Sequence, residues 1–121
     1  MNLRSFDAPR RRPVPERYRC DDGEERSIAP RTVFIFIKSH CDGCAAFHGG
    51  FQTPGWEAVV VATDDDVVAS PAIVRASALV AALDVRSAPF FVAVDHQPLE
   101  VVSEGVPFDP EHLATLLRSV S

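Results

Sequence analysis

The run Thr32-Val33-Phe34-Ile35-Phe36-Ile37 constrains the fold more than any other stretch of this sequence. All six residues are β-branched or aromatic, and such residues favour strands. Because apolar side chains do not alternate with charged ones, the run indicates a strand that is covered on both faces, as in the centre of an α/β sheet. At 121 residues, the chain is long enough to bury one such core but short for two domains.

The middle of the chain carries one further strand signal and one helix signal. Residues 56–62, with three consecutive valines, predict a second buried strand. Ser70 and Pro71 predict the start of a helix, since serine is a good N-cap and proline is tolerated in the first turn. Apolar residues then repeat at helical spacing, although a short strand over 72–74 ahead of a helix over 77–83 fits the same segment.

The last third of the chain predicts a hairpin and a helix. Residues 90–94 are a third apolar strand, and residues 99–102 return antiparallel to it after a turn. Asp109 and Pro110 have the residue types of an N-cap and a first helical position, and leucines at helical spacing follow them. The order of elements predicts an α/β fold in which helices flank a central mixed sheet on both sides.

The N-terminal quarter differs in composition. Residues 1–17 hold three prolines and five arginines without apolar periodicity, which is typical of an extended arm. An acidic turn over 21–24 then separates two short segments that predict a weak hairpin. We therefore expect an arginine- and proline-rich arm with a short hairpin over residues 1–30, and a compact domain over residues 31–121.

Charge and hydropathy exclude several classes of protein. The net charge of −5 argues against a surface for nucleic acid or anionic lipid, because either would require a basic face. No stretch reaches the roughly 18 apolar residues of a membrane span. Arg10-Arg11-Arg12 is followed by Pro-Val-Pro-Glu-Arg, so it does not predict an export signal. We expect a cytoplasmic monomer, and in that reducing compartment a close cysteine pair is more often catalytic or metal-binding than structural.

Cys41 and Cys44 are the residues that point to chemistry. They stand in KSHCDGC, where the first buried strand ends and a short helix is expected. The first turn of a helix presents free N–H groups that stabilise a thiolate, so we expect Cys41, but not Cys44, to titrate below the ordinary thiol pKa of about 8.5. With two residues between them, the second thiol can resolve a mixed disulfide formed on the first. Haem attachment is excluded, because it needs CxxCH and Ala45 follows Cys44.

Taken together, these segments resemble the thioredoxin-like superfamily. TVFIFIKSHCDGC is similar to the superfamily's central strand and CxxC site, DVRSAPFFVAVD to the segment with its cis-proline, and LEVVSEGVPFDPEHLATLLRSV to its closing hairpin and helix. The resemblance covers residues 30–121, and the leading arm resembles that of the branch related to TlpA and MauD. It implies a three-layer sandwich, with a central mixed sheet between helices, and the activity of a thiol–disulfide oxidoreductase.

The resemblance also implies roles for individual residues. Cys41 would be the exposed nucleophile and Cys44 the more buried resolving thiol. A cis bond before Pro89 would offer the backbone of Ala88 to an extended substrate segment. The substrate groove would be formed by His40, Asp42, Gly43, Ala88 and Pro89. No cofactor or metal is implied: the substrate would be a disulfide-containing protein or a small thiol, and an external donor would supply electrons.

The motif departs from that of the thioredoxins themselves. Thioredoxins carry Trp directly before the first cysteine and Gly-Pro between the two, whereas this chain has His40 and Asp42-Gly43. The acid found six residues ahead of the nucleophile in thioredoxins is Ile35 here. A protonated His40 would stabilise a Cys41 thiolate and Asp42 would oppose it, so we expect a reductant rather than an oxidant.

Two other interpretations of the cysteine pair remain open. A redox-inert thioredoxin-like domain would use the same cleft, or the arginine-rich arm, to hold a partner protein. A zinc or copper site would recruit Cys20, His40 or His48 to the pair. Otherwise Cys20 is a bystander thiol, and Asp64-Asp65-Asp66 fits a solvated loop better than a metal site.

Overall fold

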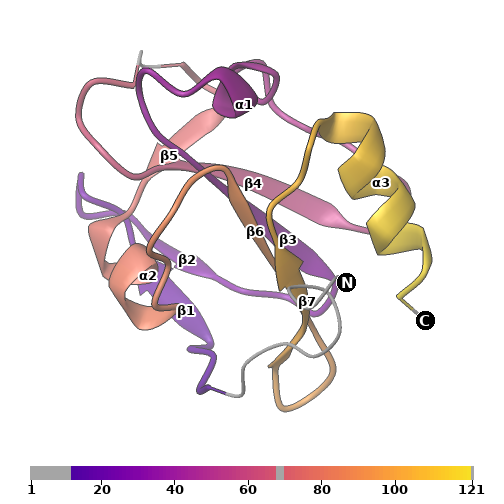
Figure 1. Cartoon of the computed structure of the whole chain (residues 1–121). Helices are drawn as coiled ribbons and strands as arrows, with labels where there is room; N and C mark the ends of the chain where they lie inside the picture. The colour runs from indigo at the N-terminus through magenta and orange to yellow at the C-terminus, as the bar shows by residue number, and fades with distance from the viewer. Residues whose placement is uncertain (1–11, 68–69, 121) are drawn as a thin grey trace.

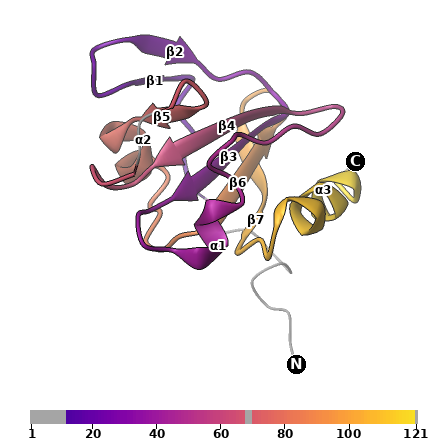
Figure 2. The same ribbon diagram turned by 90° about the horizontal axis from the view of Figure 1, so that it is seen from above.

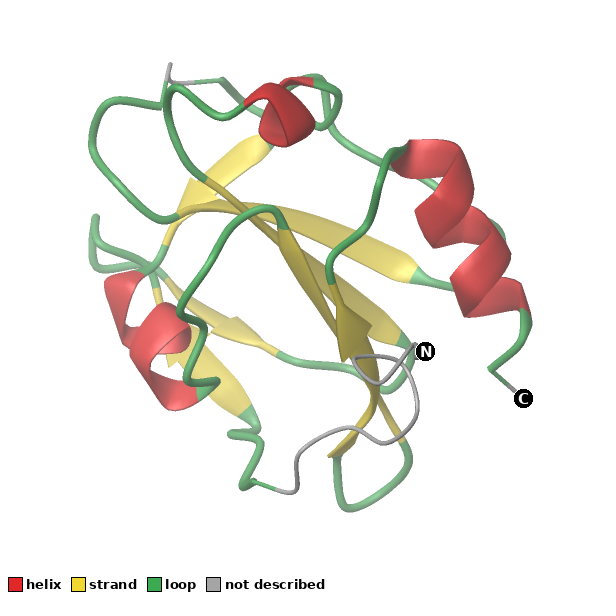
Figure 3. Ribbon diagram, viewed as in Figure 1, coloured by secondary structure: helices red, strands yellow, loops and turns green. Residues whose placement is uncertain are grey.

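The structure, a computed structural model, describes residues 12–67 and 70–120. Along this range, groups of consecutive strands are each followed by a helix (Figures 1 and 3). In chain order the elements are β1 (Arg17–Arg19), β2 (Glu25–Ser27), β3 (Thr32–Ile37), α1 (Asp42–Ala45), β4 (Glu57–Ala62), β5 (Ile73–Arg75), α2 (Ser77–Ala82), β6 (Phe90–Asp95), β7 (Glu100–Gly105) and α3 (Pro110–Arg118). None of these helices, within the described residues, is long and apolar enough to span a membrane.

The predicted central strand, β3, lies in the middle of a five-stranded mixed sheet. The strand order is β5-β4-β3-β6-β7. β4 runs parallel to β3, with Thr32 opposite Glu57, and β6 runs antiparallel to it, with Thr32 opposite Val94. All six residues of β3 are buried, as the apolar run predicts. The sheet therefore confirms the predicted α/β class.

Alternate residues of β3 face two separate cores. Its odd-numbered residues join a cluster that includes Cys44 of α1 and Leu117 of α3. Phe34 and Phe36 join a second cluster that includes Leu79 of α2 and residues of the β1–β2 hairpin. Figure 2 shows the same arrangement, with α1 and α3 on one side of the sheet and α2 and the hairpin on the other. Three layers result, and the sheet is the middle one.

The segment over residues 70–83 corrects the prediction of a helix that starts at Ser70-Pro71. Residues Ile73–Arg75 instead form the edge strand β5, parallel to β4, and α2 begins only at Ser77. The hydroxyl of Ser70 accepts a hydrogen bond from the N–H of Ala72, at 3.2 Å, but caps no helix. Consecutive β-branched residues favour pairing with the open edge of β4, so the alternative of a strand followed by a helix is correct.

The predicted hairpin forms and packs on the sheet. β1 and β2 pair antiparallel across the acidic turn, and the ring of Tyr18 meets Phe34 edge to face, with centroids 5.8 Å apart. The N–H of Asp21 donates to the carbonyl of Arg75, at 2.8 Å, which links the turn to the outer edge of β5. Most of the predicted arm, residues 1–11, lies outside the described residues.

The closing helix has the predicted cap. Asp109 is the N-cap of α3, Pro110 follows in the first turn, and the Asp109 side chain accepts a hydrogen bond from the His112 N–H at 2.7 Å. Leu113 and Leu117 are the fully buried residues of its inner face.

Candidate functional site

The two cysteines lie where the central strand ends and α1 begins. Cys41 is the N-cap residue of α1 and is half-buried, whereas Cys44 is completely buried on the inner side of the same turn. The Cα atoms are 5.2 Å apart, and the two sulfurs form a disulfide. The arrangement therefore presents one sulfur toward the surface and holds its partner in the core.

The loop before β6 packs against the pair. The Ala88–Pro89 peptide bond is cis, and the carbonyl oxygen of Ala88 lies 3.8 Å from the Sγ of Cys41. A Cβ atom added at Gly43 would lie 3.1 Å from the Cγ of Pro89, closer than side chains ordinarily approach. Glycine at position 43 thus allows the proline ring to pack directly on the CxxC turn.

The side chains of His40 and Asp42 flank Cys41 in the sequence and are exposed. His40 has a φ angle of 54°, a left-handed conformation that few non-glycine residues adopt. Asp42 is the acidic residue in the first turn of α1, a helix of only four residues. The structure thus brings five of the predicted site residues together, namely Cys41, Gly43, Cys44, Ala88 and Pro89. The side chains of the other two, His40 and Asp42, are exposed beside Cys41 in the sequence.

Asp64, which the sequence predicts to lie in a solvated loop, supports the turn before Cys41. The Oδ2 atom of Asp64 accepts hydrogen bonds from the N–H of Ser39 at 3.2 Å and from its hydroxyl at 2.9 Å. Although partial burial works in the opposite direction, the hydrogen bonds from Ser39 hold the pKa of Asp64 below its ordinary value. One sequence signal for this contact is the position of Asp64 shortly after β4. The carboxyl end of β4 lies beside that of the parallel strand β3, which leads to Ser39.

A backbone donor reaches the buried sulfur. The N–H of Lys38 donates a hydrogen bond to the Sγ of Cys44, at 3.4 Å. Cys44 is otherwise surrounded by the apolar cluster under α1 and α3, which includes Ile37, Phe47 and Phe91. The N–H of Lys38 is therefore a hydrogen-bond donor to a sulfur atom that the apolar core shields from water.

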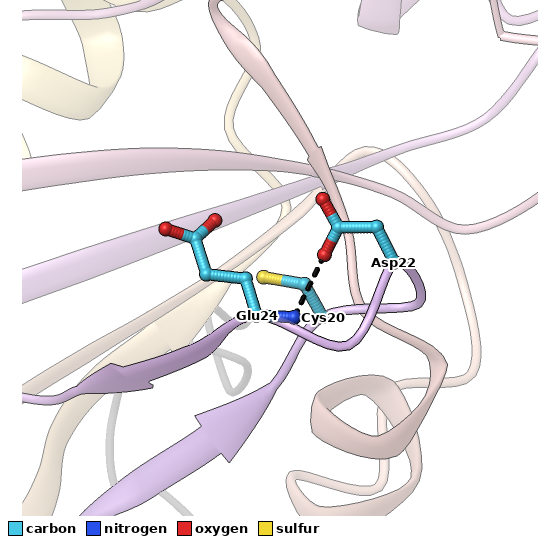
Figure 4. A group of neighbouring side chains, drawn as sticks. All are labelled: Cys20, Asp22 and Glu24. Carbon is cyan, nitrogen blue, oxygen red and sulfur yellow. Dashed lines mark hydrogen bonds between the residues drawn. The ribbon is translucent and has the colours of Figure 1, made fainter.

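Cys20 lies on the opposite face of the sheet from the pair. It is buried with Tyr18 and Ile28 in the cluster under α2. Its sulfur and carboxylate oxygens of Asp22 and Glu24 lie within 4.8 Å of one another. Figure 4 shows these three neighbouring side chains. Cys20 therefore does not join Cys41 and Cys44 in the mixed metal site considered above.

The pKa of Cys20 leads to a prediction about alkaline stability. Burial raises the pKa of Cys20 above that of an ordinary thiol; Arg26 opposes the shift, and Asp22 and Glu24 add to it. The folded state thus holds the thiol proton at pH values where the unfolded state has lost it. The free energy of unfolding should be unaffected by this thiol below about pH 8 and should fall as pH rises from about 9 through the raised pKa.

Urea unfolding of the oxidised protein at several pH values would measure this fall. Cys20→Ala should make the free energy of unfolding depend less steeply on pH between about pH 8 and about pH 10. Cys41 and Cys44 form a disulfide and do not titrate, so Cys20 is the cysteine whose removal is tested. An equally steep fall in Cys20→Ala would show that the thiol is not responsible.

Comparisons with known proteins agree with the architecture. No family model matches the sequence, and no curated protein does either. Among solved structures, the chain is similar to DsbF of MTB, determined in mixed oxidised and reduced forms, with a TM-score of 0.56 and 19% sequence identity. The match covers 90% of this chain and 100% of that one.

The protein therefore has a thioredoxin-like fold. It carries a CxxC disulfide at the end of the central strand of that fold.

Proposed function

We propose that this protein is a small thiol–disulfide oxidoreductase that works through Cys41 and Cys44. The observation that carries the proposal is the disulfide between a half-exposed and a fully buried cysteine, packed against the Ala88–Pro89 loop. A structural disulfide would need no access to its sulfur atoms, whereas an exchange site needs one sulfur that a substrate can reach.

In the reaction, the Cys41 thiolate attacks one sulfur of a substrate disulfide and forms a mixed disulfide. The other substrate sulfur leaves as a thiolate and takes up a proton. Cys44 then loses its proton and attacks the Sγ of Cys41, which releases the second substrate thiol and leaves the protein disulfide. The substrate gains two electrons, the protein dithiol loses them, and an external thiol or reductase restores the dithiol.

The groove for the substrate would be formed by His40, Asp42, Gly43, Ala88 and Pro89. The close packing of Gly43 on Pro89 and the position of the Ala88 carbonyl beside Cys41 support this assignment. The substrates would be disulfide-containing proteins or small thiols. No bound cofactor takes part in these steps, and we propose that a monomer acts in a reducing compartment such as the cytoplasm.

Reduction of insulin by dithiothreitol tests the proposal. Catalytic amounts of the protein should shorten the lag before insulin precipitates. A lag identical to that without protein would contradict the proposal and favour a redox-inert module that binds a partner through the same cleft.

We further propose that the protein acts as a reductant. Strong oxidants of this chemistry stabilise the reduced form with a positive group beside the thiolate, whereas Asp42 carries the opposite charge. Its side chain is exposed in the first turn of α1. We therefore expect a reduction potential more negative than about −200 mV.

Asp42→His should move the potential upward, by roughly 30 mV for each 1.4 kcal/mol by which it stabilises the dithiol form. Equilibration of wild type and variant with glutathione buffers measures both values. A wild-type potential near −120 mV, that of a strong oxidant, would contradict the reductant role.

A further inference from the structure

We propose that Asp64 is a positioning residue for the resolving cysteine. Its carboxylate holds the turn over residues 38–40, so that the N–H of Lys38 points at the Sγ of Cys44. This inference rests on the proposed oxidoreductase function, and it explains how a completely buried thiol is activated in a chain with Ile35 at the position of the thioredoxin acid.

The hydrogen bonds between Asp64 and Ser39, here called the tether, start from a carboxylate that is itself held in place. Its Oδ2 accepts both hydrogen bonds from Ser39, and its Oδ1 accepts one from the N–H of Asp66 at 3.2 Å. The carbonyl of Asp64 in turn accepts a hydrogen bond from Nη1 of Arg75, at 2.9 Å. Arg75 also donates to the carbonyl of Val67. Arg75 of β5 therefore holds the backbone of the loop, and the N–H of Asp66 holds the carboxylate, while the carboxylate binds Ser39.

Ser39 directly follows Lys38, whose N–H donates to the Sγ of Cys44 at 3.4 Å. The carbonyl of the preceding residue, Ile37, accepts hydrogen bonds from the N–H and the hydroxyl of Thr63, at 2.8 and 3.0 Å. The chain is thus anchored on both sides of Lys38, to two consecutive residues after β4. Loss of the Asp64 anchor would release the end that leads into the active-site turn.

The hydrogen bond from Lys38 matters most when Cys44 is a thiolate. Burial in an apolar cluster disfavours the charged form and raises a thiol pKa, whereas a donated hydrogen bond favours the charged form. In the resolving step Cys44 must lose a proton to solvent, attack Cys41 and expel the substrate thiolate. A well-placed Lys38 N–H stabilises the attacking thiolate, so the tether should increase the fraction of Cys44 that can react.

The test compares Asp64→Ala with Asp64→Asn, whose amide oxygen still accepts hydrogen bonds from Ser39. The ¹³Cβ shift of Cys44, followed against pH in a reduced Cys41→Ser background, reports the Cys44 pKa without any substrate. Asp64→Ala should raise this pKa by about 0.5–1 unit, the amount expected for weakening one hydrogen bond of ordinary strength. Asp64→Asn should give a smaller rise, because its one amide oxygen can still accept from Ser39 while its NH2 group cannot accept from the N–H of Asp66.

The direction of the shift separates positioning from a simple effect of charge. Removal of a nearby negative charge by itself favours a thiolate and lowers its pKa. Asp65→Ala is the matched control, since it removes an exposed carboxylate from the neighbouring position and should lower the Cys44 pKa slightly or leave it unchanged. Ser39→Ala keeps the backbone donor and loses the hydroxyl, so it should give a smaller rise, and it replaces Asp64→Ala if that variant fails to fold.

A kinetic readout follows in the protein with both cysteines. Resolution of a preformed mixed disulfide between Cys41 and a thionitrobenzoate group should be about 3–10-fold slower in Asp64→Ala than in wild type, in line with the smaller thiolate fraction. A Cys44 pKa that is unchanged or lowered in Asp64→Ala would overturn the positioning role, and so would an equal rise in Asp64→Asn. The Cys44 pKa is measured without substrate, so the two proposals can fail separately. Failure of the wild type to reduce insulin would overturn the proposed function, and the Cys44 pKa in Asp64→Ala would still test the positioning role of Asp64.

Discussion

Replacing Arg12 by alanine is expected to lower the free energy of unfolding by about 3–5 kcal/mol, the usual effect of removing one member of a buried ion pair. Nη1 and Nη2 of Arg12 bind the carboxylate of Glu104 in β7 at 3.1 and 2.6 Å, and Nε donates to the carbonyl of Leu83 at 2.8 Å. The side chains of Arg12 and Glu104 are only 10% and 6% exposed. Alanine would leave the carboxylate of Glu104 buried without this partner.

Urea unfolding would measure the loss. Arg17→Ala is the matched control, because the pair between Arg17 and Glu25 is exposed and should contribute less than about 1 kcal/mol. The double variant Arg12→Met, Glu104→Met should recover most of the lost stability, since apolar residues of similar size often replace a buried ion pair without loss. If Arg12→Ala matched Arg17→Ala, the ion pair between Arg12 and Glu104 would not be a main contribution to stability.

Cys41→Ser and Cys44→Ser should each reduce insulin turnover to the rate of dithiothreitol alone. Serine at position 41 removes the sulfur that a substrate reaches. Serine at position 44 removes the buried sulfur that releases the substrate from its mixed disulfide with Cys41. Cys20→Ala should retain turnover, because Cys20 is buried on the other face of the sheet. The assay is the insulin reduction described above, with equal concentrations of each variant.

The two serine variants should fail in different ways. Cys44→Ser should still consume one equivalent of an activated disulfide, whereas Cys41→Ser should react slowly because the sulfur of Cys44 is completely buried. Rapid reaction of Cys41→Ser at Cys44 would mean that the roles of the two cysteines are reversed.

Most of the architecture was predictable because the strongest local patterns also determine the sheet. The apolar run over Thr32–Ile37 is the central strand, and the cap at Asp109-Pro110 begins α3 where the sequence predicts it. The segment around Ile73 was ambiguous for a physical reason. Its apolar spacing fits a helix, whereas its consecutive β-branched residues fit a strand, and the open edge of β4, a tertiary feature, decides between them.

The candidate site was predictable where chemistry depends on the local motif. Cys41 and Cys44 stand out in the sequence, and their disulfide brings them together as the CxxC spacing indicates. The support from Asp64 was not predicted, because it depends on the alignment of β4 beside β3 and on the hydroxyl of Ser39. The ion pair of Arg12 was missed as well, because its partner is 92 residues away in the sequence.

Capture of a mixed disulfide tests the central claim most directly. Cys44→Ser would be incubated with oxidised insulin, acid-quenched and analysed by peptide mass spectrometry without reduction. The account predicts an insulin chain linked through a disulfide to Cys41, and loss of that adduct in the double variant Cys41→Ser, Cys44→Ser. Absence of any adduct, or an adduct on Cys20 instead, would contradict it.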